Sequence, residues 1–200
     1  MGNDWEGLHS EAVPEPVAQE KPRQGFRRFI VDLLETLLLA LLLFFAINTI
    51  SARIRVDGSS MEPTLHSGEF MIVNRLAYKL GSPQVGDVVV FHFPGNPEQE
   101  YIKRIIGLPG DRVEIKEGMV SVNGQALNEP YIAAPPAYEE SLTVPPGMLF
   151  VLGDNRNNSS DSHSWGPVAL DQVVGKAILV YWPPAEWGVV EHVMPLNPEE

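Results

Sequence analysis

The longest apolar stretch of the chain lies close to its N-terminus. Residues 37–47 are eleven consecutive apolar residues, and residues 29–50 form a 22-residue segment with only five polar interruptions. A helix of this length just spans a hydrocarbon core of about 30 Å. Because residues 37–47 leave no polar face to meet water, they do not suit a helix packed on a soluble core. We therefore predict one transmembrane helix at residues 29–50.

The charges that flank this segment predict its orientation. Four basic residues precede it within positions 21–28, so the positive-inside rule places the N-terminus in the cytoplasm and the rest of the chain outside. Arg53 and Arg55, directly after the segment, oppose this orientation. A cleavable signal peptide fits less well, since the apolar part follows a long acidic tail. We predict that residues 1–28, rich in Glu, Pro and Gln, are a disordered cytoplasmic tail.

After residue 50 the apolar positions change to short or alternating runs separated by turn residues. These runs are 54–56, 70–73, 87–93, 101–106, 112–115, 120–122, 148–152 and 173–182. Short runs with such spacing are typical of a β-rich barrel or sandwich, and Asn123-Gly124 predicts a hairpin turn. We expect a mainly β, compact catalytic domain at residues 51–190 and a C-terminal tail at residues 191–200.

Composition narrows the class of protein further. The chain has 200 residues, 18 prolines, 17 glycines and a formal net charge of -12. An acidic domain repels phosphate backbones, which argues against a nucleic-acid partner. The absence of cysteine excludes disulfides, thiol catalysis and cysteine-bound metal, and it is compatible with an extracytoplasmic location.

Ser60 is the first candidate for chemistry. It lies in a run just beyond the transmembrane segment, Gly58-Ser59-Ser60-Met61-Glu62-Pro63-Thr64-Leu65. A serine becomes a useful nucleophile when a histidine, a lysine or a metal-bound hydroxide removes its proton. Considered alone, the run is also a reasonable turn after a short strand.

Lys103 offers a base, provided that its ammonium form is destabilised by burial. It lies in the apolar run 101–106, where strand alternation places Lys103 and Ile105 on one face and Arg104 on the other. If the Lys103 face points inward, the pKa of the amine falls. A solvated lysine on an outer face is the open alternative.

A third polar stretch, residues 153–166, directly follows the apolar residues 149–152. A surface loop that binds calcium through Asp154, Asn155 and Asp161 is an alternative, but the spacing does not match an EF-hand. The histidines show no ligand spacing, so we predict no metal site. A Ser-His-Asp arrangement through His92 or His163 stays open.

These stretches, in this order after one transmembrane segment, resemble the bacterial type I signal peptidases, the membrane-bound Ser/Lys endopeptidases that remove leader peptides from exported proteins. The resemblance covers most of residues 30–182. It rests on four motifs, at residues 60–65, 86–91 and 103–111 and in the stretch from Gly153-Asp154-Asn155-Arg156 through Gly166.

The resemblance implies a role for each matching residue. Ser60 would be the nucleophile, Lys103 the general base, and Ser159 the hydroxyl that orients the lysine amine. Three more residues would hold the site together, namely Asp154, Arg156 and Asp161. Small apolar pockets that accept the substrate are expected near Val56, Met61 and Ile102.

Two positions depart from the common family pattern. Gly58 stands where some members have a serine that contributes to the oxyanion hole, so backbone N–H groups must do more of that work. His163 stands where the family often has an arginine that pairs with the motif's aspartate, here Asp161, and a neutral histidine would weaken that pairing.

The resulting hypothesis is a membrane-anchored serine endopeptidase without a cofactor, acting on secretory preproteins at the lipid bilayer. A self-cleaving Ser/Lys protease and a non-catalytic anchored β module are the alternatives. The first is disfavoured by the anchor, and the second by the presence of Ser60, Lys103 and Ser159. A penicillin-binding enzyme is disfavoured because Pro63, not lysine, stands three residues after Ser60.

Overall fold

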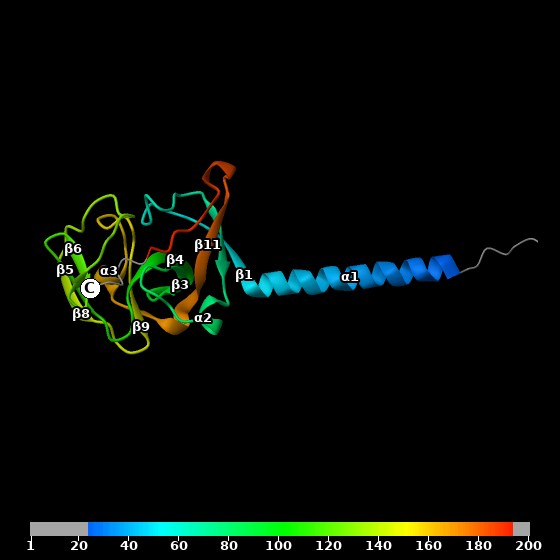
Figure 1. The fold of residues 1–200 in the computed structure, drawn as a ribbon, viewed down its shortest axis with the longest axis horizontal. Helices are drawn as coiled ribbons and strands as arrows, with labels where there is room; N and C mark the ends of the chain where they lie inside the picture. The colour runs from blue at the N-terminus through cyan, green and yellow to red at the C-terminus, as the bar shows by residue number, and fades with distance from the viewer. Residues whose placement is uncertain (1–23, 194–200) are drawn as a thin grey trace, which may run out of the picture. The chain divides into compact units, whose positions relative to one another are not determined.

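The computed structural model describes residues 24–193 (Figure 1). The described part of the chain begins with the helix α1, Gln24–Ile50, and the chain divides within this helix, after Leu43, into two compact units. The second unit contains all the strands. The tail predicted at residues 1–28 lies outside the described residues except for positions 24–28, which are helical.

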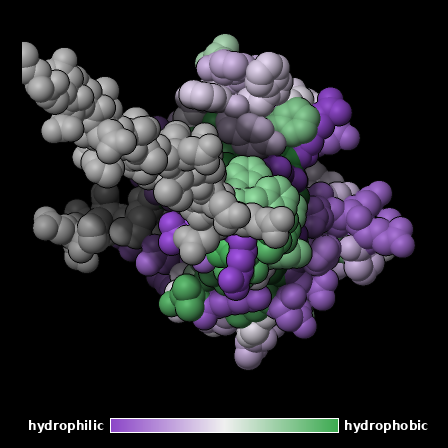
Figure 2. Space-filling model, turned by 90° about the vertical axis from the view of Figure 1, so that its right-hand side faces the viewer, coloured by the Kyte–Doolittle hydropathy of each residue, from purple (hydrophilic) through white to green (hydrophobic). Residues whose placement is uncertain are grey.

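Helix α1 is mostly apolar, and its side chains from residue 25 to residue 50 are exposed among the described residues. Gly25–Ile50 has a mean hydropathy of 2.5, and none of its most apolar window is buried. A helix with this composition and length can cross a membrane. It begins five residues before the predicted position 29, because residues 24–28 include Gln and Arg, which continue a helix well. Figure 2 colours the described residues by hydropathy, and the surface that it draws carries hydrophobic as well as hydrophilic side chains.

The larger sheet forms most of the second unit. Its strands follow the order β1-β2-β11-β3-β4-β9-β10, with β12 paired to β11, and all pairs are antiparallel. Their bounds are β1 Ser51–Arg55, β2 Phe70–Asn74, β3 Val88–Phe93, β4 Asn96–Gly107, β9 Met148–Leu152, β10 Val168–Ala169, β11 Val173–Trp182 and β12 Gly188–Val189. Strand β4 lies inside this sheet, between β3 and β9, so its backbone is paired on both sides.

A smaller antiparallel sheet has the order β7-β6-β5-β8. Its strands are β5 Arg112–Lys116, β6 Met119–Val122, β7 Gln125–Ala126 and β8 Glu140–Thr143. They gather at one end of the domain in Figure 1. Asn123 and Gly124 join β6 to β7 with φ angles of 54° and 83°, which confirms the predicted Asn-Gly hairpin turn.

Short helical turns connect the strands. They are α2 Ala77–Leu80, α3 Ser162–Trp165, and the 3-10 turns η1 Leu170–Gln172 and η2 Pro184–Glu186. Three clusters of buried apolar side chains fill the domain, two against the large sheet and one against the small sheet. The mainly β fold with one N-terminal apolar helix is therefore confirmed.

Each of the eight apolar runs contains or overlaps a strand, whereas β7, β8, β10 and β12 have no counterpart among the predicted runs. Three of these four have only two residues, and β8 has no buried residue, so they carry little apolar signal. The packed domain also extends past the predicted boundary at 190. Arg104 Nη1 donates to Glu191 O (3.0 Å), and Val88 N donates to His192 Nδ1 (3.2 Å).

Candidate active site

Ser60 lies in the segment that connects β1 to β2. A backbone hydrogen bond from Val56 N to Glu69 O (2.8 Å) closes this segment at its base. Within it, the side chains of Met61 and Leu65 are 2% and 1% exposed, as part of the core. The segment is thus fixed at its base and by two buried side chains, which restrict where the Ser60 hydroxyl can lie.

Lys103 reaches Ser60 from strand β4. Its side chain is buried, and Nζ lies 2.8 Å from Ser60 Oγ and 3.0 Å from Ile102 O. The first contact joins two residues that are 43 positions apart in the chain. A hydroxyl and an amine at this distance can exchange a proton directly.

The surroundings of Lys103 favour its neutral form. Burial lowers the pKa of Lys103 from 10.5 to about 8, and the carboxylates of Asp161 and Asp154 act in the opposite direction. The ring of Tyr101, whose centroid is 5.2 Å from Nζ, also favours the ammonium. With a pKa near 8, about one lysine in ten is neutral at pH 7. Lys103 can therefore act as a base near neutrality.

The next residue in the strand, Arg104, is buried as well. Its Nε and Nη2 donate to the two carboxylate oxygens of Asp154 at 2.8 and 2.7 Å, and Nη1 donates to Gly86 O at 2.9 Å. Strand alternation places Lys103 and Arg104 on opposite faces and does not tell which face is the inner one. Protein covers both faces of β4 at this point, so both side chains are buried, and Arg104 is a site residue for which the sequence motifs indicated no role of its own.

Asp154 and its neighbour tie the third polar stretch to the segment of Ser60. Thr64 Oγ1 donates to Asp154 Oδ2 at 2.5 Å. Asn155 N donates to Ser60 O at 3.0 Å, and Asn155 Nδ2 donates to Ser59 O at the same distance. The loop after β9 thus holds the nucleophile segment by both its backbone and a side chain.

Gly153 packs directly against this segment. A Cβ at Gly153 would overlap both Ser60 O and Ser159 Oγ, so the close approach requires glycine. Ser159 Oγ is buried, and no hydrogen-bond partner for it is found among residues 24–193. The described hydrogen bonds of Lys103 Nζ go to Ser60 and Ile102, so the orienting role of Ser159 stays a prediction.

Asp161 supports the same loop and pairs with His163. Its carboxylate accepts from Gly153 N (2.9 Å) and lies 2.7 Å from His163 Nδ1. The His163 ring stacks on Tyr138, with centroids 3.9 Å apart. A histidine therefore occupies the position of the expected arginine and keeps a close contact with the buried aspartate, although the contact is ionic only when the ring is protonated.

Arg156 is held by residues outside the predicted motifs. It forms a two-pronged ion pair with Glu129, at 2.9 and 2.8 Å, and its Nε donates to Gly153 O at 3.0 Å. The Tyr131 ring lies 4.0 Å from Arg104 Cζ and 5.8 Å from Arg156 Cζ, and Tyr131 donates to Glu129. Nothing in the sequence around Glu129 and Tyr131 distinguishes them from an ordinary turn, so a structure is needed to find them.

Three apolar residues expected near the substrate line one pocket with Ser60 and Lys103. Val56, Met61 and Ile102 are in the wall of this pocket of about 260 Å³. Gly58 is also in the wall and has a φ of +90°, a conformation that favours glycine. The three apolar side chains thus lie in the same pocket as the Ser60 hydroxyl, and their contact with substrate stays a prediction.

The alternative sites receive no support from the side-chain partners. Asp154 is engaged by Arg104 and Thr64, and Asp161 by Gly153 and His163, so neither presents a free ligand for calcium. Across residues 24–193 no group of three acidic or histidine side chains is arranged to hold a metal. The described partner of the Ser60 hydroxyl is a lysine and not a histidine.

Comparison with known proteins gives a consistent result. The protein-family model described as signal peptidase, peptidase S26, matches residues 30–182. A probable signal peptidase I-2 of Synechocystis sp. is 44% identical, over 80% of this chain and 77% of its own. A signal peptidase I of Leptolyngbya laminosa is 40% identical to this chain, and the match covers 92% of this chain and 94% of the relative. A signal peptidase I of Bacillus caldolyticus is 42% identical, and the match covers 64% of this chain and 78% of the relative.

Proposed function

The chain belongs to the signal peptidase family, peptidase S26, and on this premise we propose that it is a membrane-anchored serine endopeptidase that removes N-terminal signal peptides from exported preproteins. The observation that carries the proposal is the 2.8 Å contact between Ser60 Oγ and the buried amine of Lys103. The chemistry is acyl transfer through an ester of Ser60.

In the proposed acylation, neutral Lys103 takes the proton of Ser60 as Oγ attacks the carbonyl carbon of the scissile peptide bond. The resulting tetrahedral intermediate carries a negative oxygen, and we assign the Ser60 backbone N–H to its stabilisation because Gly58 has no side chain to offer. The Lys103 ammonium then gives its proton to the leaving amine. The C–N bond breaks, the mature protein departs, and the signal peptide stays bound to Ser60.

Deacylation reverses the roles with water in place of the amine. Lys103, neutral again, removes a proton from water as its oxygen attacks the ester carbonyl carbon, and the ammonium returns a proton to Ser60 Oγ as the ester bond breaks. The apolar wall formed by Val56, Met61 and Ile102 suits a small residue before the cleavage site. No metal or cofactor takes part in this scheme.

The anchor gives the enzyme access to its substrates. Helix α1 has the length and hydropathy of a membrane span, and we propose a cytoplasmic N-terminus and an extracytoplasmic catalytic domain from the basic residues that precede the apolar segment. We assign the anchor to residues 29–50 and the catalytic domain to the residues from 51 to at least 192, since Glu191 and His192 contact strands β4 and β3. A single-pass anchor confines enzyme and membrane-borne preprotein to one surface and so raises their effective concentration.

Cleavage of an exported precursor tests the proposal. The wild-type chain in lipid bilayers should cut the precursor once, after a small residue at the end of the signal peptide, with the site mapped by mass spectrometry. Ser60→Ala and Lys103→Met should each lower the rate by at least about a thousandfold. Ser82→Ala, which removes an exposed hydroxyl outside the site, is the matched control. Near-normal cleavage by either dyad variant would falsify the mechanism.

A further inference from the structure

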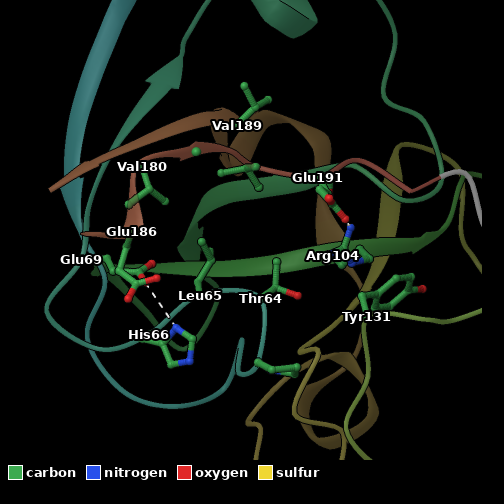
Figure 3. A pocket seen from close by; sticks show the side chains of 13 residues that line it. Thr64, Leu65, His66, Glu69, Arg104, Tyr131, Val180, Glu186, Val189 and Glu191 are labelled. Atoms are coloured by element: carbon green, nitrogen blue, oxygen red, sulfur yellow. Dashed lines mark hydrogen bonds and ion pairs between the residues drawn. The ribbon is translucent and has the colours of Figure 1, made fainter. Parts of the chain in front are cut away.

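A second pocket of similar size lies elsewhere on the domain and shares no lining residue with the pocket of Ser60 and Lys103. Its volume is about 270 Å³. One wall is the segment 63–66, which follows the nucleophile, and another is the C-terminal segment 188–191 (Figure 3). The acyl-transfer mechanism uses none of this space.

Glu69 is the unusual residue in this pocket. Its side chain is 95% buried, and Oε1 lies 3.3 Å from His66 Nδ1. The other carboxylate oxygen, Oε2, is buried without a hydrogen-bond partner among the described residues. Figure 3 draws the Glu69 carboxylate among the side chains at the His66 end of the pocket. A buried carboxylate oxygen without a donor is costly, and a donor supplied by a ligand would remove the cost.

Three of the four permanently charged side chains in the wall are acidic. Glu186 and Glu191 line it together with Glu69, and both are exposed. Arg104 is the arginine in the wall, but its Nε, Nη1 and Nη2 all donate to protein oxygens, including both carboxylate oxygens of Asp154. Its charge is therefore balanced, and an anion would meet three carboxylates without gaining a strong donor.

The rest of the wall determines which kind of cation fits. Leu65, Val180 and Val189 provide apolar surface next to the carboxylates. A bare metal ion gains nothing from such surface, and no group of three metal-binding side chains occurs in residues 24–193. A short alkyl stem that ends in a cationic group with several N–H donors matches both parts of the wall.

We propose that this pocket binds an alkylguanidinium or alkylammonium group, with the head between Glu69 and Glu186 and the stem against Leu65 and Val180. The group can belong to a free small amine or to an arginine or lysine side chain of a peptide. The proposal is independent of the peptidase activity, since binding can be measured without any cleavage.

The test is a ligand-observed NMR titration of the full chain in a zwitterionic detergent. The probes are n-butylguanidinium and its neutral analogue n-butylurea. The wild type should bind the cation at least about tenfold more tightly than the urea, because only the cation places a positive charge opposite the carboxylates. Glu69→Gln and Glu186→Gln should each abolish most of this preference. Glu186 is exposed, so its variant should fold even if Glu69→Gln does not.

Asp57→Asn is the matched control, because Asp57 is an acidic residue in the wall of the other pocket. It should leave the affinity for n-butylguanidinium unchanged. Equal affinity for cation and urea, or a loss of binding in Asp57→Asn but not in Glu186→Gln, would overturn the proposal. A third probe, arginine capped at both ends, distinguishes a peptide side chain from a free small amine as the source of the cation. If it binds as tightly as n-butylguanidinium, the pocket takes peptide side chains. If only n-butylguanidinium binds, the pocket takes free amines.

Discussion

Thr64 Oγ1 donates a 2.5 Å hydrogen bond to Asp154 Oδ2, the same oxygen that accepts from Arg104 Nη2 at 2.7 Å. Thr64 is four residues after Ser60, Arg104 directly follows Lys103, and Asp154 belongs to the loop after β9. One buried carboxylate therefore connects the segment of the nucleophile to the strand of the base.

Removing the Thr64 hydroxyl should loosen the alignment of Ser60 with Lys103. Thr64→Val keeps the shape of the side chain but leaves Asp154 with one donor fewer. We expect kcat for precursor cleavage to fall by about tenfold, the effect of losing roughly 1.4 kcal/mol of positioning energy, while KM changes little. Thr64→Ser, which restores a hydroxyl, should recover most of the rate. Equal rates for the valine and wild-type enzymes would contradict the connection.

Breaking the pair of Arg104 and Asp154 should mainly affect folding. Arg104→Met leaves a fully buried carboxylate without its cationic partner, which typically costs about 3–5 kcal/mol. Urea unfolding followed by tryptophan fluorescence should show this loss in the full chain. The double variant Arg104→Met with Asp154→Leu should be more stable than Arg104→Met alone, because no charge is left unpaired. A single variant as stable as the wild type would contradict the assignment.

The pKa of Lys103 predicts the pH dependence of cleavage. Burial lowers it to about 8, so the amine becomes protonated and loses its function as a base when the pH falls below that value. We expect kcat/KM to decrease by about tenfold for each pH unit below 8 and to level off above it. A substrate whose residues near the cleavage site do not ionise separates this effect from substrate titration. A flat profile between pH 6 and 8 would exclude Lys103 as the base.

The sequence was informative where a strong apolar pattern or a motif was present. The 22-residue apolar segment predicted α1, and the run 173–182 coincides with β11. Ser60, Lys103 and Asp154 could be named because each lies in a motif of the family. The contact of Ser60 with Lys103 could be expected only by resemblance, since 43 residues separate them.

The sequence was uninformative where a residue gains its role from a partner far along the chain. Glu129 and Tyr131 lie between the motifs, and their role becomes visible only when Arg156 and Arg104 are seen against them. The burial of Arg104 could not be read from the sequence for a related reason. Alternation predicts which face a side chain is on, but it does not show that both faces of β4 are covered.

His163 allows a sharper test of how Lys103 is tuned. Its Nδ1 lies 2.7 Å from Asp161 Oδ1, and Asp161 is a carboxylate that raises the pKa of Lys103. Tyr138 stacks on the ring, and Ser164 Oγ lies 3.2 Å from Nε2. In His163→Arg a permanent positive charge should offset the effect of the Asp161 carboxylate on the pKa of Lys103. A guanidinium can also stack on Tyr138, as the imidazole ring does. The pKa of Lys103 should therefore fall.

The acid limb of the kcat/KM profile should then move to lower pH in His163→Arg, and cleavage at pH 6.5 should increase by about twofold to threefold. His163→Gln, which keeps a hydrogen-bond donor but carries no charge, should leave the limb in place or move it to higher pH. The two profiles are compared with the same precursor and the same detergent. If the arginine variant moves the limb to higher pH, the charge next to Asp161 does not control Lys103, and His163 serves only to hold the loop.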